Sequence, residues 1–138
     1  MIVVCGLPNA GKTTYSAKYS NIIHFDSISH RNPDEQFKKC SRLVADAKED
    51  ICVEGVYNSK KRRRELLDVC KRQKKVCIWI DTPIEECIKR ENRDRPSSLV
   101  EHHAKIFEPP TLDEGWDEII RIREGEVIER WQKDQPNH

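Results

Sequence analysis

The chain has 138 residues, a length typical of one domain with a core of its own. Hydrophobic and charged residues each make up 36% of the sequence, and 25 basic residues against 24 acidic ones leave a net charge of +1. This balance does not indicate a nucleic-acid-binding protein, and the lack of any apolar stretch near 18 residues argues against a membrane helix.

Short apolar runs separated by polar, helix-like segments predict alternating strands and helices. In chain order we expect a strand at 1–5, a helix at 12–19, a strand at 22–25, a helix at 35–48, a strand at 51–56, a helix at 60–73, a strand at 76–80, helices at 83–92 and 98–106, and a strand at 118–122. Asp34 and Ser59 are the expected N-caps of the second and third helices. The alternation predicts one α/β domain over residues 1–138, with a five-stranded, mostly parallel sheet flanked by helices. Disorder is one expectation for the tail from about residue 132.

The six cysteines lie at apolar positions of these elements, and no pair has the Cys-x-x-Cys spacing of a metal site. We interpret them as reduced thiols that pack as small hydrophobic side chains. No basic region precedes the short apolar run at the N-terminus, as a secretory signal would require. We therefore expect a cytoplasmic protein without a membrane partner.

The first predicted strand leads directly into the motif Gly-x-x-x-x-Gly-Lys-Thr at residues 6–13, which we call the phosphate loop. Its glycines let backbone N–H groups surround phosphate oxygens, and the following helix adds its positive end. The motif predicts ATP binding with Mg²⁺ as cofactor, Lys12 on the β- and γ-phosphates and the Thr13 hydroxyl on the metal. The expected ATP-binding residues of the loop are Leu7, Pro8, Asn9, Ala10, Gly11, Lys12, Thr13 and Thr14.

Two omissions narrow the class of nucleotide-binding protein. The sequence has no Asn-Lys-x-Asp guanine signature, and it is short for a motor ATPase. A compact P-loop kinase therefore remains, in which a second substrate accepts the γ-phosphoryl group.

Acidic residues end the second and third predicted strands, at the sheet edge where ligands of parallel sheets gather. Asp26 is the candidate general base for an attacking hydroxyl, with a simple cap of the following turn as the alternative. Glu54 is the candidate for the Mg²⁺ shell, and its alternative is an inward polar residue paired with a cation. Asp81, after the fourth strand, is the weaker candidate because Asp-Thr-Pro also suits the start of a helix.

An arginine-rich segment follows the fourth predicted helix, with Arg90, Arg93 and Arg95 in a stretch that ends at a proline. Such a segment resembles the lid of small kinases, in which the planar guanidinium holds two phosphate oxygens as charge develops. Glu91 and Asp94 alternate with these arginines, so ordinary ion pairs on the surface are the alternative to a lid. We expect all three arginines to contact ATP.

Three segments carry a more specific resemblance: the phosphate loop, the strand and lid at 80–95, and the sequence Phe-Glu-x-Pro-Thr-x-x-Glu-Gly at 107–115. Together they resemble the kinase domain of the 5′-hydroxyl polynucleotide kinases of phage and mammalian end repair, and the third is the most distinctive. The resemblance extends to about residue 124. It implies ATP-dependent phosphorylation of 5′-hydroxyl ends of DNA or RNA, with Lys12, Asp26 and Arg93 as catalytic residues.

The sequence departs from this family on the acceptor side. Ser29 stands where the phage pattern has an arginine three residues after the base, and Arg31 is the candidate substitute. The family's Asp-x-Thr-Asn stretch is replaced by the sequence at 54–58. A kinase of a small metabolite or of a tRNA-attached substrate is therefore the alternative, and a catalytically idle nucleotide-binding module is a third. No Asp-x-Asp motif of a fused phosphatase is present, and the oligomeric state is left open.

The third predicted helix begins a basic cluster, with nine basic and two acidic residues between positions 60 and 75. The cluster follows the strand end that borders the expected acceptor site. We predict that Arg62, Arg63 and Arg64 bind phosphates of a polynucleotide acceptor, together with Asp26 and Arg31 at its 5′ end. The alternative is a solvated helix face without a ligand.

Overall fold

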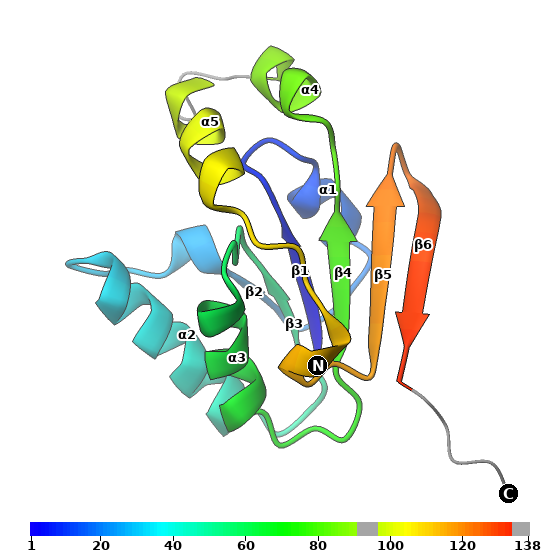
Figure 1. Ribbon diagram of the computed structural model, residues 1–138. Helices are drawn as coiled ribbons and strands as arrows, with labels where there is room; N and C mark the ends of the chain where they lie inside the picture. The colour runs from blue at the N-terminus through cyan, green and yellow to red at the C-terminus, as the bar shows by residue number, and fades with distance from the viewer. Residues whose placement is uncertain (91–96, 134–138) are drawn as a thin grey trace, which may run out of the picture.

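A computed structural model describes residues 1–90 and 97–133, and six strands of this part of the chain form one sheet in the order β2-β3-β1-β4-β5-β6 (Figure 1). The strands are β1 (Ile2–Gly6), β2 (Ile22–His24), β3 (Cys52–Glu54), β4 (Val76–Ile80), β5 (Glu118–Arg123) and β6 (Glu126–Gln132). The first five are parallel, and β6 is antiparallel to β5. The predicted α/β class with a mostly parallel sheet is therefore confirmed, and β1 lies at its centre.

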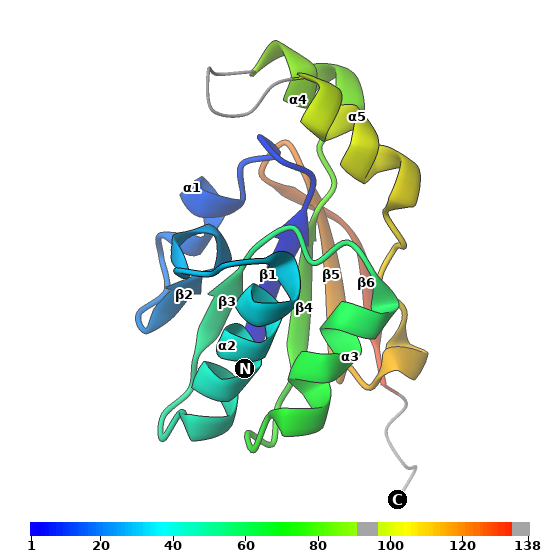
Figure 2. The same ribbon diagram turned by 90° about the vertical axis from the view of Figure 1, so that its left-hand side faces the viewer.

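Helices cover the sheet and its upper edge. They are α1 (Lys12–Ser16), α2 (Pro33–Asp46), α3 (Lys60–Val69), α4 (Ile84–Lys89) and α5 (Ser97–Ile106), with short 3₁₀ turns η1 (Phe25–Ser27) and η2 (Leu112–Glu114). Figures 1 and 2 show α2 and α3 side by side on one face and α1 on the other. The same views place α4 and α5 above the carboxyl ends of the strands, where the phosphate loop lies.

The sixth strand was not predicted. Glu124 (φ 52°) and Gly125 (φ 79°) form a two-residue turn in the left-handed conformation, which joins the antiparallel strands β5 and β6. Tight hairpins use such turns because their twist matches that of the strands. All residues of β6 except Trp131 are exposed, so the strand lacks the apolar run that located the other five.

Helix boundaries differ from the prediction where local capping decides them. The N-cap of α2 is Asn32, whose side chain accepts the N–H of Glu35, whereas Asp34 pairs with Arg62 across α2 and α3. Ser59 caps α3 as predicted, since its hydroxyl accepts the N–H of Arg62. The helices α1 and α3 end at Ser16 and Val69, earlier than their apolar spacing suggested.

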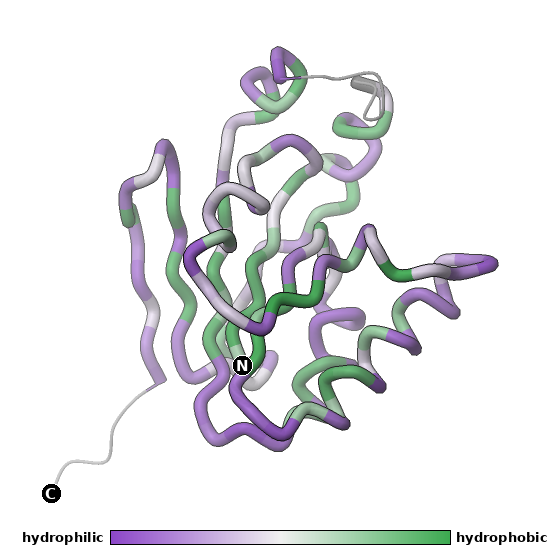
Figure 3. The backbone as a smooth tube through the Cα atoms, turned by 180° about the vertical axis from the view of Figure 1, so that it is seen from behind, coloured by the Kyte–Doolittle hydropathy of each residue, from purple (hydrophilic) through white to green (hydrophobic). Residues whose placement is uncertain are grey.

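Alternate residues of the central strands fill two cores, one on each face of the sheet. Val3, Cys5 and Cys77 face α2 and α3, whereas Val4 and Ile78 face the opposite side. Figure 3 shows the resulting hydrophobic stretches along these strands. All six cysteines have free thiols, five of them are buried, and burial raises the pKa of Cys40 to about 11. Within the described part of the chain, no helix has the length and apolar character needed to cross a membrane.

Tyr57 is a buried tyrosine, only 2% exposed, whose hydroxyl lies beside the Cys40 thiol but makes no hydrogen bond of normal geometry within the described structure. Burial raises the pKa of this hydroxyl, so it stays protonated. An unsatisfied buried polar group costs about 1–3 kcal/mol. We therefore expect Tyr57→Phe to raise the free energy of unfolding by about 1 kcal/mol, measured by urea denaturation. A lower free energy of unfolding in the variant would show that the hydroxyl has a stabilising partner.

Candidate active site

The phosphate loop connects the end of β1 to the start of α1 and turns sharply between them. Asn9 (φ 66°) and Gly11 (φ 101°) adopt the left-handed conformation, and Gly11 is the N-cap of α1. Left-handed residues in such a turn point backbone N–H groups inward, where they form an anion-binding concavity. The observed strand, loop and helix are the context in which this motif binds phosphate.

Two side chains of the loop are already aligned with the acidic end of β3. The Lys12 side chain is nearly buried, and its Nζ donates to the Leu7 carbonyl oxygen at 2.7 Å, which keeps the ammonium inside the loop. The Thr13 hydroxyl donates to Glu54 Oε1 at 2.6 Å, so it lies next to the carboxylate that the sequence proposed for the Mg²⁺ shell. Both residues therefore face the same space.

A cavity of about 240 Å³ brings most of the predicted catalytic residues together. Its walls are Pro8, Asn9, Gly11, Lys12, Thr13, Thr14, Asp26 and Glu54. Asp26 enters from η1, directly after β2, and is exposed to solvent. The parallel register, which pairs His24 with Glu54, places the ends of β2 and β3 side by side and so explains why the two carboxylates meet here.

The oxygen atoms beside this cavity fit a magnesium ion. Mg²⁺ prefers oxygen ligands and is usually held by one or two protein groups together with phosphate oxygens and water. Thr13 Oγ1 and Glu54 Oε1 are the protein oxygens in position. No cluster of three or more histidine, cysteine or acidic residues that could hold a metal ion occurs among the described residues.

A second and larger cavity of about 840 Å³ lies on the other side of the phosphate loop. It is bounded by the loop itself, by α4 and by the β5–β6 turn at Glu124 and Gly125. Arg90, at the end of α4, reaches the loop with its Nη1 atom 3.3 Å from the Ala10 carbonyl oxygen. This space is large enough for the base and sugar of a nucleotide whose phosphates occupy the loop.

Of the three arginines predicted for the lid, only Arg90 lies among the described residues. Its side chain lies over the loop, since a Cβ atom on Gly11 would approach Arg90 Nη1 to 3.5 Å. It also pairs with Glu86 one helical turn earlier. Arg93 and Arg95 lie outside the described residues, so their roles stay predictions.

The basic cluster corrects the sequence interpretation. Arg63 is fully buried, with 0% of its side chain exposed, and pairs with Glu114, so it has no surface with which to bind an acceptor. Arg62 stacks on Phe37 at 4.1 Å and pairs with Asp34 and Glu65. The Arg62 guanidinium therefore lies in the α2–α3 interface, where these residues contact it. Arg63 is wrong as an acceptor contact because the helix turns it into the core.

The remaining predicted residues on the acceptor side have separate positions. Arg64 is exposed, pairs with Asp68 and donates to the Glu114 carbonyl oxygen, while Arg31 is exposed in the loop before α2. Asp81 pairs with Arg121 and Arg123 of β5 and is not part of the 240 Å³ cavity. These ion pairs link the end of β4 to β5.

Sequence reasoning missed several contacts that hold the site. Thr82 Oγ1 donates to the Ala10 carbonyl oxygen at 2.6 Å, and Asn9 Nδ2 donates to the Cys87 carbonyl oxygen at 3.3 Å, so α4 and the residues before it support the loop. Glu114 accepts hydrogen bonds from Arg63 and from the Thr111 N–H. The Thr-x-x-Glu spacing at residues 111–114 is that of a capping box, and it could have identified Glu114 as a residue that stabilises this turn.

Comparison with known proteins gave structural likenesses only. No protein-family model and no curated protein matches the sequence. A gluconokinase from Sinorhizobium meliloti 1021 superposes with a TM-score of 0.67 at 15% identity, covering 88% of this chain and 81% of its own. A sugar kinase from Janibacter sp. HTCC2649 gives 0.68 at 18% identity, covering 88% and 83%.

A third solved structure, a fungal RNA kinase, superposes with a TM-score of 0.59 at 16% identity, covering 87% of this chain but only 37% of the RNA kinase chain. All three neighbours are kinases. At these identities the likeness shows the fold alone, and that fold is the α/β fold with a mostly parallel sheet that the sequence predicted.

Proposed function

We propose that the protein transfers the γ-phosphoryl group of ATP to the 5′-hydroxyl end of a polynucleotide. The observation that carries the reaction class is the cavity in which Lys12, Thr13, Glu54 and Asp26 meet. The phosphate loop would bind ATP. The exposed Asp26 carboxylate, which lines the same cavity, would accept the proton of the second substrate. The kinase fold of the structural neighbours agrees with this arrangement.

The reaction follows from these positions. The Asp26 carboxylate accepts the proton of the 5′-hydroxyl group as its oxygen forms a bond to the γ-phosphorus, and the bond from that phosphorus to the β–γ bridging oxygen breaks to release ADP. Lys12 and the loop N–H groups hold the phosphate oxygens while negative charge redistributes among them. Mg²⁺ held by Thr13 and Glu54 would neutralise phosphate charge when it is bound.

The open acceptor side supports a polymer end as the second substrate. Asp26, Thr13 and Thr14 are exposed, and the cavity that they share is about 240 Å³, smaller than typical pockets that enclose a small ligand. A chain end can reach Asp26 from solvent while the rest of the polymer stays outside. The segment at 107–115 that resembles polynucleotide kinases contacts the β3–α3 loop, where its Glu108 N–H donates to the Asn58 carbonyl oxygen.

The test is a panel of acceptors incubated with ATP labelled in its γ-phosphate. It contains DNA and RNA oligonucleotides with 5′-hydroxyl ends, a tRNA carrying its natural modifications, and small hydroxylated metabolites that include gluconate and common sugars. We expect label on the oligonucleotides. Label on gluconate or a sugar alone would instead show a small-molecule acceptor of the kind for which two of the structural neighbours are named.

Glu54→Gln is expected to raise the Mg²⁺ concentration that gives half-maximal ATP binding about tenfold, on the scale of losses at groups that hold a metal or orient its ligands. The amide keeps a hydrogen-bond partner for Thr13, which lies 2.6 Å from Glu54 Oε1, but it removes the negative charge. Calorimetric titration of ATP at several Mg²⁺ concentrations measures the shift. Glu49→Gln, an exposed glutamate outside both cavities, is the control. An unchanged Mg²⁺ dependence in Glu54→Gln would remove Glu54 from the metal site.

A further inference from the structure

We propose that Arg63, paired with Glu114 in the core, is a positioning residue for Asp26, through the contacts of the β3–α3 loop with Phe25. The inference rests on the proposed function, because it gives the buried pair a role in placing the general base. It replaces the acceptor contact that the sequence suggested for Arg63. The contacts that carry it run from the core to the cavity in three steps.

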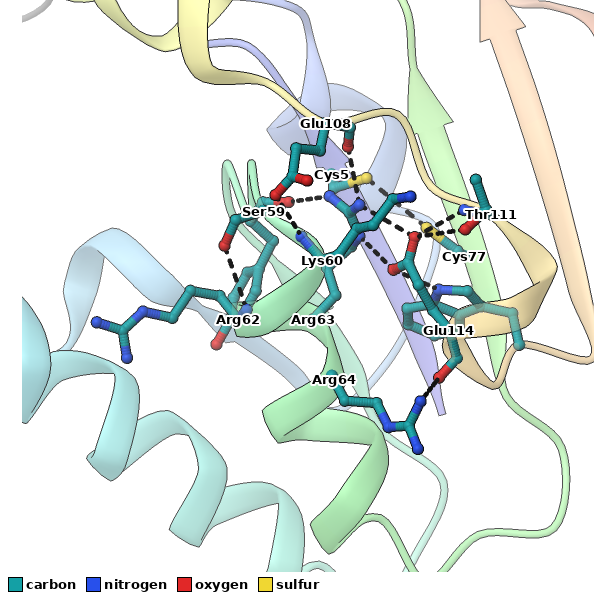
Figure 4. A network of polar contacts seen from close by, with 12 residues as sticks. Cys5, Ser59, Lys60, Arg62, Arg63, Arg64, Cys77, Glu108, Thr111 and Glu114 are labelled. Atoms are coloured by element: carbon teal, nitrogen blue, oxygen red, sulfur yellow. Dashed lines mark hydrogen bonds and ion pairs between the residues drawn. The ribbon is translucent and has the colours of Figure 1, made fainter.

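The first step is the anchoring of the loop by one guanidinium. Arg63 Nε donates to Glu114 Oε1 at 2.7 Å, its Nη1 to the Tyr57 carbonyl oxygen at 2.8 Å and its Nη2 to the Glu108 carbonyl oxygen at 2.8 Å. Figure 4 shows Arg63 of α3 between Glu108 and Glu114. The β3–α3 loop, the stretch between α5 and η2, and η2 itself are therefore tied to one planar group with fixed donor directions.

Glu114 is held as firmly as its partner. It accepts from the Thr111 N–H at 2.7 Å and from Trp116 Nε1 at 3.3 Å, and only 4% of its side chain is exposed. Burial by itself lowers the pKa of the Arg63 guanidinium, but the hydrogen bonds and charge of Glu114 outweigh it, so the net pKa is raised. Arg63 therefore keeps its charge and all of its donors under any condition in which the protein is folded.

The second step is the conformation of Tyr57. Its φ of 36° is positive, which is rare for a residue with a bulky side chain and persists only where the surroundings impose it. The hydrogen bond from Arg63 to the Tyr57 carbonyl oxygen is one such restraint. The Tyr57 ring, thus oriented, meets the Phe25 ring edge-on with centroids 5.3 Å apart.

The third step joins Phe25 to the base. Phe25 directly precedes Asp26, and its backbone carbonyl oxygen accepts a hydrogen bond from Gln36 Nε2. On the other side Phe25 packs on Gly55, the residue after Glu54, so closely that a Cβ atom there would lie 2.7 Å from Phe25 Cβ. The β3–α3 loop therefore supports Phe25 through Tyr57 and Gly55. A shift of either residue would move Phe25 and, with it, the adjacent Asp26.

The test uses the pair Arg63→Met with Glu114→Gln, which removes the buried charges together and keeps one side-chain acceptor oxygen, for either Trp116 Nε1 or the Thr111 N–H. Removing one charge alone would leave the other uncompensated in the core. We expect the double variant to fold and bind ATP with unchanged affinity, but its kcat should fall about 10- to 100-fold, since a shift of about 1 Å in a reacting group has effects of this size. A purely structural pair would change the melting temperature and leave kcat unchanged.

A second variant changes the packing of Phe25 on the β3–α3 loop and leaves Arg63 and Glu114 unchanged. Gly55→Ala pushes on Phe25 directly, and the same loss of kcat with unchanged ATP affinity is expected. If the double variant does not fold, this variant still tests the third step, because wild-type kcat in a folded Gly55→Ala protein would break the path from the loop to Asp26. Arg72→Met is the matched control, because Arg72 also donates to backbone carbonyl oxygens, those of Lys48 and Ala47, but far from the cavity in sequence and fold. Its kcat should equal that of the wild type.

Crystal structures of the wild type and the double variant separate this inference from the proposed function. Displacement of Asp26 by about 1 Å relative to Thr13 is expected whether or not any acceptor is phosphorylated. Failure of the wild type to label an oligonucleotide would count against the function alone. Folded variants with wild-type kcat, or with Asp26 in its wild-type position, would overturn the positioning role.

Discussion

Replacing Lys12 with alanine should lower the kcat for phosphoryl transfer by about 10²- to 10³-fold, the usual effect of removing one preorganised group that stabilises developing charge. The Lys12 side chain is buried in the wall of the active-site cavity, so its ammonium acts where water is largely excluded. In the structure its Nζ donates to the Leu7 carbonyl oxygen within the loop, in reach of the phosphate site. Steady-state transfer to an oligonucleotide measures kcat, and a separate ATP titration measures the affinity for ATP.

The control for this variant is Lys18→Ala. Lys18 lies just after α1, is exposed and places its ammonium 3.8 Å above the Tyr15 ring, outside the catalytic cavity. Its loss removes the same charge from the same region of sequence, and kcat should not change. Equal kcat values for Lys12→Ala and Lys18→Ala would contradict the assignment of the phosphate loop as the donor site.

Asp26→Asn should lower kcat by about 10²- to 10⁴-fold, the range that general acid–base groups contribute. The amide keeps the size of the side chain but cannot take the proton of the attacking hydroxyl at neutral pH. Because Asp26 lies outside the motif at residues 6–13 that is expected to bind the phosphates, ATP affinity should be preserved. The separation of the two effects distinguishes this variant from Lys12→Ala.

Asp46→Asn is the control for the base. Asp46 is an exposed carboxylate at the end of α2, and it lines neither of the two cavities beside the phosphate loop. Single-turnover measurements with saturating ATP show the chemical step directly. Near-wild-type turnover in Asp26→Asn would mean that another group, or no group, accepts the proton.

The donor half of the site was predictable because its signal is local. Gly6, Gly11, Lys12 and Thr13 form one contiguous motif, and the apolar runs on either side of it identify a buried strand and the start of a helix. Asp26 and Glu54 were predictable one step later, since parallel strands place their carboxyl ends at one edge. The structure lines one cavity with all of these except Gly6.

The acceptor half was harder to predict because its residues act across the fold. Arg63 was interpreted as part of a charged surface, although its spacing to Leu66, Leu67 and Cys70 is that of one helix face. Both leucines are buried, and Arg63 is buried beside them as a charge paired with Glu114. No local pattern shows that Glu114, some fifty residues later, is the partner that makes such burial possible.

Capping and strand edges account for the remaining differences. Both Asn32 and Asp34 can cap a helix, and only the side-chain hydrogen bond to the Glu35 N–H shows that Asn32 does so. The strand β6 has no buried face, so its residues carry little hydrophobic pattern. The Glu124-Gly125 turn was the one available signal for a further hairpin.

The most direct test of the proposed function uses one oligonucleotide in two forms that differ only at the 5′ end. One form has a 5′-hydroxyl group and the other a 5′-phosphate, and each is incubated with the protein, Mg²⁺ and ATP labelled in its γ-phosphate. We predict that label enters the hydroxyl form alone and is recovered as a 5′-mononucleotide after nuclease digestion. Equal labelling of both forms, or labelling of neither, would contradict transfer to a 5′-hydroxyl end.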